Sequence, residues 1–408
     1  MSTRDEQSSI LEGHWTLPQV QSNGQVPPAR GGHASVAVGT KVIVFGGANR
    51  AATPFTDLWV LETDGGQYVW SLVAVVMGPG VNLTARTGAS MTAIGHEVYL
   101  YGGQDPVTGV CFDDILILDT KTWRWSTVEV ESGKPPARHS HCTGLFKGIC
   151  LLVFGGAGMH GTLGDIWIFN TGDKTWITPV AEGKPPCPRE MHTGTMITDG
   201  RMLVFGGRSP AGQVLCDFSV FDGDRGIWVE SVPTPHFLCC HSAVPFPQAP
   251  PTPSPPSPSP LEGTSSSTLD QALRDSSTNG MLANGAAHRE HPFASASAQP
   301  QQQTLCLLFG GFTGGGVDGT MLAVDAASST IEVCDRGPKD IGDMSLRPLP
   351  RFAHSAVVVP SSFCGKHSME VVIFGGVSPD ADFNDTAVWR PGLSRIEDNE
   401  ETDIMEEQ

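Results

Sequence analysis

A short apolar run that ends in Gly-Gly recurs six times along the chain. The first glycines of these pairs are Gly46, Gly102, Gly155, Gly206, Gly310 and Gly375. The first four are about 50 residues apart, and the long gap before the fifth contains a segment of different composition. A period of this length is typical of folds built from repeated supersecondary units, so it constrains the fold more than any other feature.

Each repeat unit holds four short candidate strands in the same order. A turn with a basic residue and, in most units, a histidine precedes the first strand, as at Arg30 and His33. The Gly-Gly run is the second strand, another apolar run is the third, and a tryptophan opens the fourth. That tryptophan is Trp70, Trp123 or Trp125, Trp176 and Trp228 in the first four units, and Ile331 holds its place in the fifth. Turn-forming residues bound the runs, so each unit predicts a four-stranded antiparallel sheet.

The second strand of each unit is apolar at nearly every position. This pattern is expected of a central strand that is buried on both faces. One such sheet cannot bury both of its faces alone, whereas six sheets arranged radially around an axis can. The sequence therefore predicts an all-β fold, a six-bladed β-propeller with four antiparallel strands per blade.

These motifs resemble the Kelch-repeat family, whose signature combines the apolar Gly-Gly run, an Asp-apolar-aromatic strand and the spaced tryptophan. The resemblance covers roughly residues 14–246 and 303–392. It implies a non-enzymatic protein-interaction module, a scaffold or adaptor that is similar in layout to Rab-effector Kelch proteins. The partner protein would be a small GTPase, actin or a degradation substrate, and the last would make the protein a substrate receptor of a ubiquitin ligase.

The sixth unit lacks a tryptophan strand, and residues 14–18 offer one around Trp15. We expect this N-terminal strand to complete the last blade and close the ring, because closure hides the first and last strand edges. Two units depart from the pattern. The fifth has Leu238 in place of the arginine, and the second has Ala89 in place of the histidine.

Residues 247–302 do not belong to the repeat. They begin with a Pro/Ser-rich stretch and end in a Gln-rich one, so we expect a disordered insertion in blade five. It is either a tolerated insertion, a ligand for SH3 or WW domains, or a site of proline-directed phosphorylation at Thr252, Ser254, Ser257 or Ser259. Residues 1–13 and the acidic residues 393–408 are also expected to be disordered.

The formal net charge is −18, which argues against nucleic-acid binding because such binding needs a basic face. No apolar stretch approaches the ~20 residues that span a membrane, and the N-terminus has no signal-peptide core. The 10 cysteines form no C-x-x-C pair. We interpret them as reduced thiols of a cytoplasmic or nuclear protein.

The candidate binding site is the propeller face that carries the arginine-containing turns and the loops after Gly-Gly. Arginines at the same place in successive blades form a ring around the axis, and guanidinium groups bind carboxylates through paired hydrogen bonds. By the resemblance, such arginines hold acidic peptides or C-terminal carboxylates in some Kelch relatives. The candidate binding residues are Arg30, Arg50, Arg86, Arg138, His160, Arg189, Arg208 and Arg351. The alternative for the turn arginines is a structural role, as anchors that donate hydrogen bonds to backbone carbonyls.

No catalytic constellation is found in the sequence. One histidine per blade recurs at His33, His141, His192, His241 and His354. We interpret these as buried structural residues, because metal sites are built from unlike residues that converge. A galactose-oxidase-like copper centre is disfavoured because the tyrosines are only Tyr68, Tyr99 and Tyr101, and the last two lie in a strand expected to be buried. The E-x-x-x-D-x-x-x-H iron motif of specifier proteins is not found. We therefore expect no metal and no cofactor, and a metal-dependent propeller enzyme or specifier is the alternative function.

Overall fold

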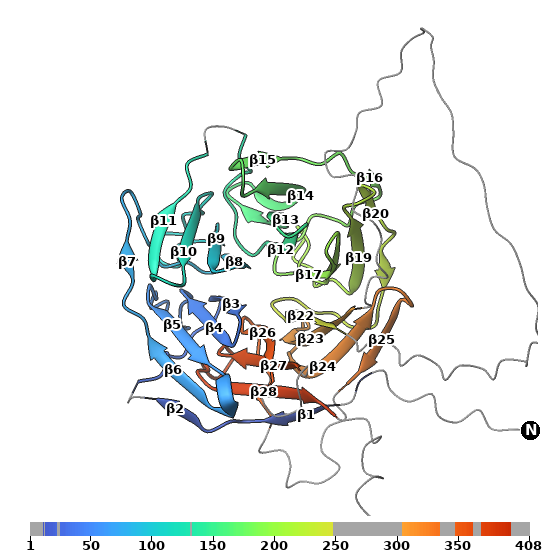
Figure 1. The fold of residues 1–408 in the computed structure, drawn as a ribbon. Coiled ribbons are helices and arrows are strands. Elements are labelled where there is room, and N and C mark those ends of the chain that lie inside the picture. Colours follow the sequence, from blue (N-terminus) through green and yellow to red (C-terminus); the bar gives the residue numbers. More distant parts are fainter. Residues whose placement is uncertain are drawn as a thin grey trace, which may run out of the picture. The chain divides into compact units, whose positions relative to one another are not determined.

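The strands form six small sheets around a common axis, as the sequence predicts for a six-bladed propeller (Figure 1). The computed structural model describes residues 11, 13–22, 25–130, 133–247, 304–334, 347–361 and 369–392, and every sheet counted is formed by those residues. The sheets are numbered as blades, from blade 1, which holds Gly46, to blade 6, which holds Gly375. The innermost strands contact one another in cyclic order: β3 (Ala34–Val38), β8 (Ser90–Ile94), β12 (Cys142–Phe146), β17 (Thr193–Thr198), β22 (Ser242–Pro247) and β26 (Ser355–Pro360).

Each innermost strand is followed outward by three antiparallel neighbours. The second strands are β4 (Lys41–Phe45), β9 (Glu97–Tyr101), β13 (Cys150–Gly158), β18 (Arg201–Phe205), β23 (Thr304–Phe312) and β27 (Met369–Phe374). The third strands are β5 (Leu58–Glu62), β10 (Ile115–Asp119), β14 (Gly161–Asn170), β19 (Asp217–Asp222), β24 (Val317–Asp325) and β28 (Thr386–Pro391). The fourth strands are β6 (Tyr68–Leu72), β11 (Arg124–Thr127), β15 (Thr175–Ile177), β20 (Ile227–Trp228), β25 (Thr330–Val333) and, from the N-terminus, β1 (Gly13–Thr16).

Within the described ranges, three blades carry a short outer strand beyond the four that the sequence predicts. β2 (Val20–Ser22), β7 (Val76–Met77) and β16 (Glu182–Gly183) pair in parallel with β6, β11 and β20, and β21 (Val232–Pro233) pairs with β19. Both residues of β7 and both of β16 are exposed. These strands therefore extend the rim of the propeller and leave its core unchanged. A 3-10 turn, η1 (Asp64–Gly66), connects β5 to β6.

The second strand of each blade is the buried one, as its apolar run predicts. In β4, the side chains of Ile43, Val44 and Phe45 are 0% exposed. The tryptophan of the fourth strand packs against the aromatic residue before Gly-Gly in the preceding blade. Ring centroids lie 5.5 Å apart for Trp125 and Phe45. The repeat position in blade 2 is thus filled by Trp125 and not by Trp123.

The N-terminal strand closes the ring. β1 pairs with β28 in antiparallel register, with Trp15 opposite Trp389. Trp15 is buried and lies 4.9 Å, between ring centroids, from Phe309 of blade 5. The predicted closing strand is confirmed, and the last blade is built from both ends of the repeat region.

A buried polar cluster fixes this closure to blade 1. Arg390 on β28 donates to Glu370 Oε2 at 2.9 Å, to Thr16 Oγ1 at 2.9 Å and to the Tyr68 hydroxyl at 2.7 Å. Tyr68 belongs to β6 of blade 1 and donates in turn to Glu370. The charges of Arg390 and Glu370 thereby meet inside the protein, and strands from blades 6 and 1 share one network.

Most of the predicted insertion and tails lie outside the described residues. Pro247 ends β22 and Thr304 begins β23, so the insertion joins the first two strands of blade 5. The described part of the chain contains no helix that is long and apolar enough to cross a membrane.

Candidate functional site

The five turn arginines are buried inside their blades. Each is at most 1% exposed, and each pairs with an aspartate that lies just before the third strand in blades 1, 2 and 6 and within it in blades 3 and 4. The pairs are Arg30–Asp57, Arg86–Asp114, Arg138–Asp165, Arg189–Asp217 and Arg351–Asp385. Sequence reasoning expects these arginines to line a positive opening. That expectation needs correction, because their guanidinium groups do not reach the surface.

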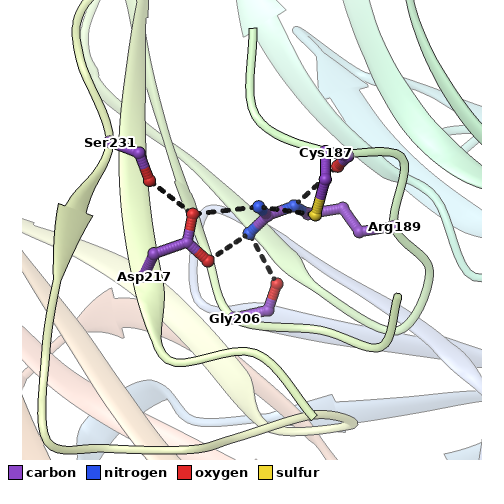
Figure 2. A network of polar contacts seen from close by, with 5 residues as sticks. All are labelled: Cys187, Arg189, Gly206, Asp217 and Ser231. Carbon is purple, nitrogen blue, oxygen red and sulfur yellow. Dashed lines mark hydrogen bonds and ion pairs between the residues drawn. The ribbon is translucent and has the colours of Figure 1, made fainter. Parts of the chain in front are cut away.

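The surroundings of Arg189 show what holds such a side chain in place (Figure 2). Its Nη1 donates to the carbonyl of Gly206 at 2.9 Å and to Asp217 Oδ1 at 3.0 Å, and Nη2 donates to Asp217 Oδ2 at 3.0 Å. Its Nε donates to the carbonyl of Cys187 at 3.1 Å. Ser231 completes the network through its hydroxyl, which donates to Asp217. The arginine thus ties the turn, the Gly-Gly end of the second strand and the start of the third strand together.

The ion pairs also set the charge state of the aspartates. Burial by itself would raise the pKa of Asp57, Asp165 and Asp217, but the hydrogen bonds and the charge of the paired arginine, together with further hydrogen bonds to each carboxylate, more than offset it, so each pKa lies below its ordinary value. Blade 5 has no such pair, because Leu238 and Thr320 occupy the two positions. The charges are therefore absent together, which is the least costly way to lose them.

The recurring histidines join neighbouring blades. In four blades the histidine Nε2 lies within hydrogen-bond distance of a hydroxyl on the first residue of the preceding blade's inner strand. These contacts are His33–Ser355, His141–Ser90, His241–Thr193 and His354–Ser242, at 2.7–2.9 Å. Between blades 1 and 2 this contact is absent. Ala34 of blade 1 replaces the hydroxyl residue and Ala89 of blade 2 replaces the histidine, so both partners are missing together.

His192 is the exception, since it faces Cys142 and neither ring nitrogen has a hydrogen-bond partner among the described residues. Burial lowers the pKa of His33, His192 and His241 to about 3, so these imidazoles are neutral. Neither these histidines nor any other described residues form a group of three or more His, Cys, Asp or Glu side chains that could hold a metal ion.

A closed ring of six backbone hydrogen bonds surrounds the propeller axis on the face that carries the arginine-containing turns. Each blade contributes the residue before its histidine position, and the amide of each donates to the carbonyl of the same residue in the preceding blade at 2.7–2.9 Å. All six have left-handed backbones, with φ between 52° and 65°. The members are Gly32, Gly88, Ser140, Met191, Cys240 and Ala353. This hydrogen-bond ring fixes the centre of the face through backbone atoms alone, so its side chains are free to differ.

The side chains that form the outer surface come from positions that vary between repeats. We call this surface the loop face. It carries the residue after each turn arginine position and the residue after Gly-Gly, which pair as isolated bridges in every blade. Blade 4 places Glu190 and Arg208 there, blade 5 places Cys239 and Phe312, and blade 6 places Phe352. Its chemistry therefore changes from blade to blade although the frame repeats.

Of the predicted binding residues, Arg50, His160 and Arg208 lie on this face with exposed or partly exposed side chains. Arg50 donates to backbone carbonyls of Ser378 and Pro379 in blade 6. His160 is exposed in the turn between β13 and β14. Arg208 donates to Glu190 Oε1 through Nε at 3.0 Å and Nη2 at 2.6 Å, with a side chain that is 42% exposed.

A cavity of about 650 Å³ opens on the loop face where blades 4, 5 and 6 meet. Its walls are mainly apolar, and Arg208 and two adjacent cysteines add polar atoms. The lining includes Met191, Arg208, Val214, Phe237, Cys239, Cys240, Phe312 and Phe352. Sequence reasoning finds only Arg208 among them. The departures of unit five from the repeat are the one signal in the sequence that points to this region.

Comparison with known proteins agrees with the fold. The model of the KLHDC2/KLHL20/DRC7 Kelch-repeats domain matches residues 9–207 and 113–242. Host cell factor of Drosophila melanogaster is 31% identical over 221 residues, which are 50% of this chain and 14% of that protein. Kelch domain-containing protein 3 of Rattus norvegicus is 31% identical over 207 residues, which are 48% of this chain and 52% of that protein. Human host cell factor 1 is 30% identical over 214 residues, or 10% of its length.

The matched part of the chain therefore spans about half the length of Kelch domain-containing protein 3 and a small part of the host cell factors. With its six blades, its Gly-Gly strands and a family model that covers more than half of its length, the chain belongs to the Kelch-repeat family.

Proposed function

We propose that the protein is a non-enzymatic interaction module that binds a partner protein on the loop face, with the cavity between blades 4, 5 and 6 as the centre of the site. The cavity is the observation that carries this proposal. Binding sites in proteins are typically concave, mostly apolar and furnished with a few polar groups, and this cavity has that composition.

The rigid frame supports the proposal. The hydrogen-bond ring and the buried arginine–aspartate pairs hold the loop face in place before any partner arrives. A preformed surface spends little free energy on ordering when it binds. The variable side chains can then be chosen for a partner without disturbing the repeat.

The chemistry of the cavity indicates the part of the partner that enters it. Phe237, Phe312 and Phe352 provide aromatic walls for an apolar side chain. Arg208 stands at the same cavity, and no polar contact within the described residues engages its Nη1. We expect a peptide segment that places an apolar side chain in the cavity and a carboxylate, from an acidic residue or a C-terminus, against Arg208.

The test is affinity purification with matched surface variants. Phe237 is 50% exposed beside the cavity, and Ile149 is 52% exposed in the β12–β13 turn at the other end of the strands. Phe237→Glu and Arg208→Glu should each remove the partner, whereas Ile149→Glu should retain it. Retention of every partner by both cavity variants would overturn the placement. Mass spectrometry of the retained proteins separates a small GTPase, actin and a degradation substrate.

A further inference from the structure

Two cysteines lie next to each other in the wall of the cavity. Cys239 is bridged to Phe312 by backbone hydrogen bonds of 3.0 and 2.8 Å, and Cys240 is a member of the hydrogen-bond ring. Both residues line the cavity; the Cys240 side chain is partly exposed and the Cys239 side chain is buried. The other described cysteines are free thiols as well, but none of them has another cysteine beside it in the sequence.

The two thiols differ in acidity. The neighbouring Cys240 thiol and the charge of Arg208 lower the pKa of Cys239, whereas the neighbouring Cys239 thiol and burial raise the pKa of Cys240. Cys239 is therefore the thiol of the pair that ionises more readily, and the ionised thiol is the attacking group in disulfide chemistry. By contrast, burial raises the pKa of Cys142 and Cys306 to about 12, so these core thiols are inert.

The turn that carries the pair is less restrained than its counterparts. In the other five blades, the residue just before the bridging position is a buried arginine with an aspartate partner. Blade 5 has Leu238 there, so the turn is held by backbone hydrogen bonds and by His241 but by no ion pair. A covalent change at residues 239 and 240 therefore meets less resistance in this blade than it would elsewhere.

We propose that Cys239 and Cys240 form a redox-active pair that a peroxide converts into a disulfide on the wall of the cavity. The Cys239 thiolate attacks one peroxide oxygen, the O–O bond breaks, and a sulfenic acid and hydroxide or alkoxide form. The Cys240 thiol then attacks the Cys239 sulfur, so that the S–O bond breaks and water leaves with the thiol proton. The two sulfurs are oxidised together by two electrons, and the peroxide is reduced.

A disulfide between adjacent residues is strained. The peptide bond holds adjacent Cα atoms about 3.8 Å apart, whereas disulfides usually join Cα atoms about 4.4–6.8 Å apart. We expect this strain to change the backbone at residue 240, whose left-handed φ of 53° serves the hydrogen-bond ring. Oxidation should reshape the cavity wall and loosen the links from Cys240 to Met191 and Ala353. This chemistry does not depend on the proposed partner binding.

The experiment is peptide mass spectrometry of the full chain after exposure to hydrogen peroxide and alkylation of the remaining thiols. Trypsin releases residues 226–274 as one peptide, and Cys239 and Cys240 are its only cysteines. The expected product is this peptide without alkyl groups and lighter by two hydrogen atoms, and dithiothreitol should restore both thiols. A peroxide dose that oxidises the exposed Cys187 but leaves both cysteines of the peptide alkylated would overturn the proposal.

Single-residue variants test the assigned roles. Ser140 occupies the position of Cys240 in blade 3, so Cys240→Ser has a precedent in this fold. In Cys240→Ser, Cys239 should stop at the sulfenic acid and be trapped by dimedone, while Cys239→Ser should lose the rapid oxidation of residue 240. Phenylarsine oxide, which bridges adjacent thiols, should bind the unmodified protein and neither variant. Binding of the arsenical to either variant would contradict the pairing.

Discussion

Replacing Arg138 by leucine should destabilise the propeller without touching the loop face. The guanidinium is 0% exposed and donates to Gly155 at 2.9 Å, to Pro136 at 3.2 Å and to both oxygens of Asp165. Breaking a buried pair costs about 3–5 kcal/mol. Asp165 is 34% exposed and water can partly solvate it, so we expect the lower end, about 3 kcal/mol.

The reverse replacement, Asp165→Thr, leaves a guanidinium buried without its counter-charge, and we expect a loss of about 4 kcal/mol. The double variant copies the Leu238–Thr320 pair of blade 5 into blade 3. Because it leaves no charge unpaired, its loss should be no larger than that of Arg138→Leu, about 3 kcal/mol, which gives a coupling energy of about 4 kcal/mol between the two residues.

Urea unfolding monitored by the fluorescence of the 9 tryptophans measures these free energies. With a slope of about 3 kcal/mol/M, the midpoint for Arg138→Leu should fall by about 1 M. Single losses that add up in the double variant to within about 0.5 kcal/mol would refute the paired arrangement. So would an Arg138→Leu variant of unchanged stability that no longer binds a partner, since that result would restore the arginine to the binding surface.

Three further results are expected. The free energy of unfolding should fall as the pH drops from about 6.5 towards 3, because buried neutral histidines such as His192 bind protons only after unfolding. The loss should be about 1 kcal/mol per histidine at about pH 5.5, and urea titrations at neutral and acidic pH measure it. Cys142→Ser should stabilise the protein by about 1 kcal/mol by giving His192 the hydroxyl that other blades supply, and a lower melting temperature would contradict this. Trp15→Ala should cost about 3–5 kcal/mol and raise the proteolysis of β1, because it opens the closing strand; an unchanged urea midpoint would count against the closure.

The fold can be predicted because its main determinants recur. Gly46 and its counterparts follow directly on the buried strand in four blades and lie within it in β13 and β23. Trp15 precedes the first turn arginine by 15 residues, close to the 13 to 16 residues that separate Trp70, Trp125 and Trp176 from theirs. The short outer strands escape prediction because two exposed residues such as Val76 and Met77 carry no pattern. The choice between Trp123 and Trp125 depends on the turn, where Trp123 has a φ of 53°.

The site is harder to predict for the opposite reason. Residues that recur in most blades, such as Arg138, serve the frame, and the sequence does hold a sign of this. An aspartate precedes the third apolar run wherever the turn arginine is present, and both are missing in blade 5. The cavity residues Phe312 and Phe352 recur nowhere, and the packing of blade 5 against blade 6 brings their ring centroids to 6.3 Å from each other.

The hydrogen-bond ring has a consequence for how such a protein can change over time. Each blade gives one amide and accepts at one carbonyl, so the six bonds form a complete ring. Duplicating or deleting a blade would add or remove one donor and one acceptor together, and the ring could close again only with a different angle between neighbouring blades. Exchanging Ser140 for another residue interrupts nothing. New binding specificities are therefore expected to arise at constant blade number, by substitution at the variable positions of the loop face and by insertion between strands.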